Sequence, residues 1–139
     1  MYVLITNNTG LYRSVKAGEY IEGSSLEVLT CVRSLVHSGS TVLTHPLCGN
    51  LRPYHQPFRS VIVDVKSGAV DLDSLSVIES AVNVYQSSPL IMPYELDDYQ
   101  REDYAYIDAE LMRESLGRYG LILNENLCNA PSLSVKEVN

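Results

Sequence analysis

Residues 19–44, EYIEGSSLEVLTCVRSLVHSGSTVLT, decide the fold, because they read as a strand, a helix and another strand in succession. Ser24 and Glu27 have the spacing of a capping box, in which each side chain bonds the backbone N–H of the other residue at a helix start. Leucine and valine then recur at helical spacing as far as Gly39, a residue that favours the left-handed turn ending a helix. The stretch predicts a helix over 25–38 between short strands at 19–22 and 41–44.

The alternation of strands and helices continues along the rest of the chain. Residues 2–6 and 59–65 are apolar runs without polar alternation, a pattern typical of strands covered on both faces. Further elements are predicted as one or two helical turns at 11–17, helices at about 72–87 and 101–118, and a last short strand or docked extension at 121–123. We therefore predict an α/β fold. It is a single three-layer domain over 1–123, with a small, mostly parallel sheet of about four strands flanked by helices, followed by a loosely structured tail at 124–139.

The charge balance and the cysteines narrow the class of protein. Ten Lys and Arg against seventeen Asp and Glu give a net charge of −7 without a basic cluster. This sign disfavours nucleic acid and anionic lipid as partners. The apolar run at the N-terminus is too short for a signal peptide or a membrane span. Cys31, Cys48 and Cys128 are an odd number with no close pairing, as in reduced intracellular proteins. We expect a cytoplasmic protein. The sequence does not determine its oligomeric state, although an exposed edge strand would be compatible with a homodimer.

The stretch VLTHPLCGNLRPYHQPF, residues 42–58, concentrates two histidines, one cysteine and three prolines and allows several interpretations. As a metal site it offers three soft ligands, His45, Cys48 and His55, where a closed zinc site needs four. As a nucleophile, Cys48 lacks an orienting carboxylate nearby in the sequence. We therefore predict neither a metal, nor a cofactor, nor a catalytic thiol.

A rigid binding loop is the third interpretation of this stretch. Its prolines bias the preceding residues toward extended backbone, and Gly49 lets main-chain N–H groups approach a ligand closely. Arg52 could grip a carboxylate or phosphate with two hydrogen bonds, and the amino end of the helix at 25–38 favours an anion. In the purely structural alternative, His45 bonds a neighbouring carbonyl and Arg52 pairs with a surface acid.

Topology places this loop at the edge of the sheet where ligands usually bind. In open α/β sheets they collect beyond the carboxyl ends of the strands. The segments beginning at Asn7, Ser24 and His45 should therefore line one shared hollow, which we expect to bind a small anion. The candidate ligand-binding residues are Asn7, Asn8, Glu22, Ser24, Ser25, Thr44, His45, Gly49 and Arg52.

Five stretches of the chain also form a recognisable set: ITNN at 5–8, YIEGSSLEVLTCVRSLVHSGSTVLTHPLCGNLRP at 20–53, PFRSVIV at 57–63, LDSLSVIESAV at 72–82 and DYAYIDAELMRESL at 103–116. Over about residues 1–118 they resemble the GrdX family, whose members are encoded with the components of glycine/sarcosine/betaine reductase. The resemblance implies a small cytoplasmic protein, accessory to a selenium-dependent amino-acid reductase and without an established catalytic activity. Its shared pattern carries over Asn7, Asn8, Glu22, Gly23, Ser24, Thr44, His45, Pro46, Gly49 and Pro53.

These observations predict a non-catalytic accessory protein that binds a small anion or a protein of the reductase system at the C-terminal rim of the sheet. The alternative is a small enzyme acting on a carboxylate- or phosphate-bearing substrate through His45, with Glu22 as the candidate general base. A third interpretation is a docking module that uses the acidic stretch YELDDYQRED at 94–103.

Overall fold

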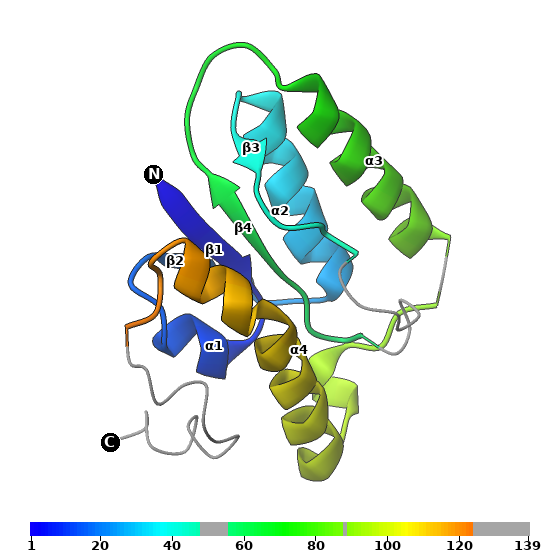
Figure 1. Ribbon diagram of the computed structural model, residues 1–139. Helices are drawn as coiled ribbons and strands as arrows, with labels where there is room; N and C mark the ends of the chain where they lie inside the picture. Colours follow the sequence, from blue (N-terminus) through cyan, green and yellow to red (C-terminus); the bar gives the residue numbers. More distant parts are fainter. Residues whose placement is uncertain (48–55, 88, 124–139) are drawn as a thin grey trace.

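A four-stranded sheet between two helical layers forms the core of the computed structural model, which describes residues 1–47, 56–87 and 89–123 (Figure 1). The strands are β1 (Tyr2–Thr6), β2 (Gly18–Tyr20), β3 (Thr41–Val42) and β4 (Ser60–Asp64). The α-helices are α1 (Thr9–Arg13), α2 (Ser25–His37), α3 (Leu72–Gln86) and α4 (Asp98–Arg118), and a 3-10 turn, η2 (Pro93–Glu95), precedes α4. The α/β class and the number of strands are as predicted.

The sheet is mixed, so the predicted mostly parallel sheet is wrong. Its order is β2-β1-β4-β3; β1 and β2 are parallel, whereas β4 runs antiparallel to both of its neighbours. Helices cover both faces of the sheet, so a central strand is buried on both sides whichever way it runs. The apolar runs that suggested parallel strands therefore report burial and carry no information on direction.

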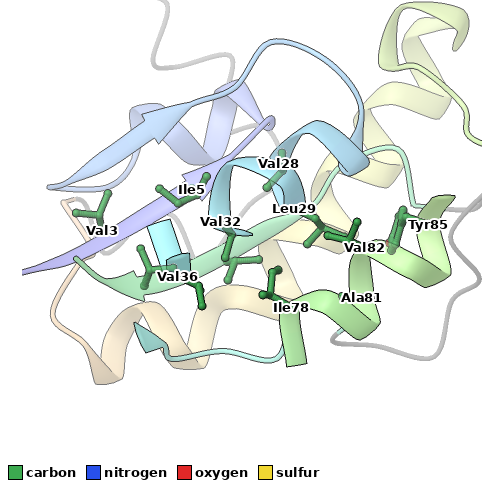
Figure 2. Packing of buried hydrophobic residues seen from close by; sticks show 12 residues of the cluster. Val3, Ile5, Val28, Leu29, Val32, Val36, Ile78, Ala81, Val82 and Tyr85 are labelled. Atoms are coloured by element: carbon green, nitrogen blue, oxygen red, sulfur yellow. The ribbon is translucent and has the colours of Figure 1, made fainter. Parts of the chain in front are cut away.

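Alternate residues of the two central strands, β1 and β4, point to the helical layers on opposite faces of the sheet. Val3, Ile5, Val61 and Val63 pack against α2 and α3, in the cluster shown in Figure 2. Leu4 and Ile62 point the other way and join the cluster beneath α1 and α4. These two apolar clusters hold the three layers together, because each one joins the sheet to one pair of helices.

Helix α2 begins and ends where the sequence predicted. The Ser24 hydroxyl accepts a hydrogen bond from the Glu27 N–H, and the Glu27 carboxylate accepts one from the Ser24 N–H, which completes the capping box. Beyond the helix, Gly39 has a φ of +113°. A Cβ added to Gly39 would be 2.6 Å from the backbone nitrogen of Gly68. Glycine is required there by both conformation and space.

The starts of α1 and α4 differ from the predictions, because a side-chain cap was overlooked at each of them. Helix α1 starts at Thr9 because the Asn8 side chain accepts the Leu11 N–H, and α4 starts at Asp98 because Asp97 accepts the Gln100 N–H. The segment at 121–123 docks on the domain through a bridge between Val15 and Ile122. The tail at 124–139 lies outside the described residues.

None of the helices in the described ranges combines the length and the apolar character needed to cross a bilayer.

Candidate functional site

The Asn7 side chain joins three segments at the carboxyl end of β1. Its amide nitrogen donates to the carbonyl oxygens of Gly23, at 3.0 Å, and Pro57, at 2.9 Å. Its amide oxygen accepts the Arg59 N–H at 2.9 Å. The chain after β1, the start of α2 and the start of β4 therefore meet at this rim of the sheet.

The neighbouring side chain, Asn8, attaches α4 to the same rim. Its oxygen accepts the Leu11 N–H, and its nitrogen donates to the Ala105 carbonyl at 3.0 Å and to the Asp108 carboxylate at 3.1 Å. Both donor hydrogens and the acceptor oxygen of the Asn8 amide are therefore engaged within the protein.

Asp108 is a buried carboxylate beneath this rim. Its Oδ2 accepts hydrogen bonds from Ser60 Oγ, at 2.7 Å, and from Asn8, and Ser60 Oγ is in turn 2.7 Å from Thr6 Oγ1. Burial raises the pKa of the Asp108 carboxyl above its ordinary value, while these hydrogen bonds and the charge of Arg59 act in the opposite direction.

Arg59 is buried in a second polar cluster, at the start of β4. Its guanidinium donates to the Tyr85 hydroxyl at 3.0 Å and to the Gln56 side-chain oxygen, and the Tyr85 hydroxyl also donates to that oxygen at 3.1 Å. Burial raises the pKa of Tyr85, against the lowering effect of the Arg59 charge. Neither this cluster nor the buried Asp108 was predicted from the sequence. The signal available in the sequence was a charged residue, Arg59, at the first position of a strand predicted to be buried on both faces.

A pocket of about 630 Å³ lies between this rim and α4. It is called the rim pocket below. Its walls come from the segment after β1, the chain from the end of β2 into the first turn of α2, Phe58, η2 and the part of α4 from Arg101 to Glu110. The volume is within the usual range of small-molecule sites, and a pocket at the carboxyl ends of parallel strands is where α/β proteins bind ligands.

Acidic side chains outnumber basic ones around the rim pocket. Glu22, Glu27, Glu102 and Glu110 line it, with Arg101 as the single basic side chain among the described lining residues. Glu27 belongs to the capping box of α2, and Glu110 pairs with Arg113 at 3.3 Å. Within the described ranges, neither Glu22 nor Glu102 accepts a hydrogen bond or pairs with a cation.

Comparison with protein families matches the GrdX-like protein model over residues 3–117. The chain belongs to the GrdX-like protein family. The match confirms the resemblance drawn from the sequence, and it includes every described residue that lines the rim pocket. No significant match to a curated protein or to a solved structure was found.

The rim pocket includes some of the predicted site residues of this GrdX-like chain. Asn7, Asn8 and Glu22 line it. Ser24 and Ser25 are buried beside it, where Ser24 caps α2 and the Ser25 hydroxyl donates to the Gln56 carbonyl. Both serines therefore have structural partners at the amino end of α2.

The remaining predicted residues do not line the rim pocket or lie outside the described part of the chain. Thr44 accepts the Ile62 N–H through its hydroxyl at 3.0 Å, and the exposed His45 accepts the Leu47 N–H on Nδ1 at 3.0 Å. Gly49 and Arg52 lie outside the described residues, as do Cys48 and His55 of the metal and thiol interpretations. Over the described ranges, the His, Cys, Asp and Glu side chains form no group of three or more that could hold a metal ion.

Proposed function

We propose that this GrdX-like protein is a cytoplasmic accessory protein of the glycine reductase system that binds a small ligand in the rim pocket and does not transform it. Family membership supports the link to the reductase system. The observation that carries the proposal is the rim pocket itself. It has the volume of a ligand site, lies at the carboxyl ends of β1 and β2, and falls within the family match.

The composition of the pocket wall favours binding over catalysis. The described lining residues include no histidine, cysteine, serine or lysine, so the candidate general bases among them are the glutamates, Glu22 included, without one of these common nucleophiles beside them. The enzyme alternative requires Glu22 and His45 to act on one substrate. Glu22 lines the rim pocket, whereas His45 does not and bonds its own loop at Leu47.

Blocking the pocket tests this proposal. We would measure glycine reduction by the purified reductase components with and without this protein, using the wild type, Ala105→Phe and His45→Ala. Ala105 lines the pocket and His45 is exposed outside it. We expect the wild type and His45→Ala to change the rate equally, and Ala105→Phe to have lost the effect.

Thermal unfolding curves would verify that both variants are folded. Loss of the effect in His45→Ala with retention in Ala105→Phe would contradict the proposal and favour the enzyme alternative. Turnover of glycine, sarcosine or betaine by this protein alone would also contradict it.

A second candidate function is the docking of a reductase component on the acidic segment at 94–103. Tyr94 and Tyr99 are 76% and 83% exposed there, among carboxylates. Such a surface suits a partner with basic residues, and its affinity should fall as salt rises. Calorimetry with each reductase component should show weaker binding for Tyr99→Ser than for the matched control Leu72→Ser, which changes an exposed side chain on α3.

Homodimer formation stays a prediction. The edge strands β2 and β3 are three and two residues long, which limits pairing between copies through the sheet. Analytical ultracentrifugation would measure the oligomeric state.

A further inference from the structure

Most side-chain N–H donors around the rim pocket are already engaged within the protein, including three of the five N–H groups of Arg101. The Asn7 and Asn8 amides donate to Gly23, Pro57, Ala105 and Asp108, as described above. Arg101 holds η2 against the start of α4, since its guanidinium donates to the carbonyls of Pro93 and Leu96 and to the Asp98 carboxylate. These residues are the described lining side chains that carry N–H groups. Apart from the two remaining Arg101 N–H groups, an anion would therefore have to displace bonds that the fold uses in order to reach a side-chain N–H donor.

The amino end of α2 is also closed to an anion. Ser24 and Glu27 complete the capping box, so a carboxylate of the protein already occupies the helix end that attracts negative charge. Gly23 lies against this carboxylate so closely that an added Cβ would be 2.3 Å from Glu27 Oε2. A second anion beside Glu27 would be repelled.

Two of the carboxylates that line the pocket have no partner among the described residues. Glu22 comes from the β2–α2 connection and Glu102 from α4, and no described residue neutralises either one. Because the two carboxylates belong to different walls, a cation in the rim pocket would be attracted from more than one wall. The net charge of −7 adds a long-range attraction of the same sign.

The rest of the wall suits the carbon groups of an organic cation. Tyr20, Phe58, Tyr94 and Tyr106 contribute to the lining, and aromatic rings attract ammonium groups, quaternary ones included. A bare metal ion fits less well, because it needs several oxygen ligands in contact with it, and the described residues offer no such group.

We infer that the rim pocket selects an organic cation, an amine or quaternary ammonium group, and not the small anion that the sequence suggested. This inference rests on the proposed binding function and adds the chemical class of the ligand.

The test is an NMR titration of the isotopically labelled full-length protein with four probes: tetramethylammonium chloride, sodium chloride at the same concentration, sodium acetate and tert-butanol. Tert-butanol has a similar shape to tetramethylammonium without its charge. We expect tetramethylammonium to shift the backbone amides of Asn8, Leu11 and Ala105 in a saturable manner, and the other probes to leave them nearly unchanged.

Two variants and a control measure the role of the carboxylates. Glu22→Gln and Glu102→Gln should each weaken tetramethylammonium binding about threefold, the size expected for one exposed charge interaction. Asp103→Asn removes a charge from the exposed, non-lining position next to Glu102 and should leave the affinity unchanged. Thermal unfolding of each variant verifies its fold.

The possible results separate the inference from the proposed function. Saturable shifts with acetate in place of tetramethylammonium would overturn the cation inference and retain a binding pocket. Equal binding of tert-butanol, or unchanged affinity in both Gln variants, would also overturn it. A protein whose rim-pocket amides respond to none of the probes would overturn the cation inference, and an Ala105→Phe variant that still acts on the reductase would overturn the proposed function separately.

Discussion

Replacing Asn7 by alanine should destabilise the domain more than replacing an exposed asparagine does, because the Asn7 side chain joins three segments of the chain. The change removes three hydrogen bonds, to Gly23, Pro57 and Arg59, from a side chain that is 2% exposed. Water can reach the Gly23 carbonyl, whose bond is only partly buried, whereas the Pro57 carbonyl and the Arg59 N–H are left in buried surroundings. Each buried polar group that loses its partner costs about 1–3 kcal/mol, so we expect a loss of about 3 kcal/mol.

This loss is a large fraction of the total free energy of unfolding, about 5–15 kcal/mol for a single domain. Urea denaturation followed by circular dichroism would measure it. With an m-value of about 1–3 kcal/mol per molar, the midpoint should fall by about 1–3 M. The matched control, Asn83→Ala, changes an exposed asparagine on α3 and should stay within about 0.5 kcal/mol of the wild type.

A third variant isolates the donor hydrogens of Asn7. Asn7→Asp has nearly the same shape, but it directs a carboxylate oxygen at two carbonyl oxygens and should destabilise at pH 7 at least as much as alanine does. A free energy of unfolding for Asn7→Ala within about 0.5 kcal/mol of the wild type, with an unchanged m-value, would refute the reasoning. The rim would then be held together without this side chain.

Three other predictions follow from single positions. In urea denaturation, Gly23→Ala should lower the free energy of unfolding by about 1–2 kcal/mol, because the Gly23 φ is +149° and the new Cβ would meet Glu27. Gly117→Ala, inside α4, should raise the free energy of unfolding by about 0.5–1 kcal/mol, because the atom nearest to its new Cβ would be 3.8 Å away. Equal effects of the two substitutions would contradict this. Burial raises the pKa of Asp108, so between about pH 4 and this raised pKa the folded chain binds more protons than the unfolded chain. The wild type should therefore lose stability relative to Asp108→Asn as the pH rises through this range. A stability difference that stays constant in urea titrations from pH 4 to pH 8 would disprove this prediction. Burial, reinforced by Glu19, raises the pKa of the Cys31 thiol to about 11. Iodoacetamide at pH 8 should therefore alkylate Cys31 about 100-fold more slowly in the native chain than in the unfolded chain. Peptide mass spectrometry that shows similar alkylation rates in the two states would count against this prediction.

The elements of this fold could be predicted from the sequence because their signals are local. The α2 helix needs only the Ser24–Glu27 capping box and the apolar repeat that follows it, and these lie within one continuous stretch. The α3 helix, predicted at about 72–87, was found at Leu72–Gln86 for the same reason. The rim at Asn7 and Ser24 was also predictable, since the carboxyl ends of parallel strands such as β1 and β2 meet at one edge.

The sequence by itself determined which stretches form the main helices and strands, which apolar residues are buried, and the family to which the chain belongs. Only the tertiary structure decided the direction of β4 and the roles of the polar residues at the rim. From the sequence alone, the Asn8 amide could bind a ligand or hold two parts of the protein together. The fold brings Asp108, one hundred positions away, to this amide, so Asn8 attaches α4 to the rim. Local sequence reports propensity and burial, whereas a polar side chain acquires its role from the partner that the fold brings to it.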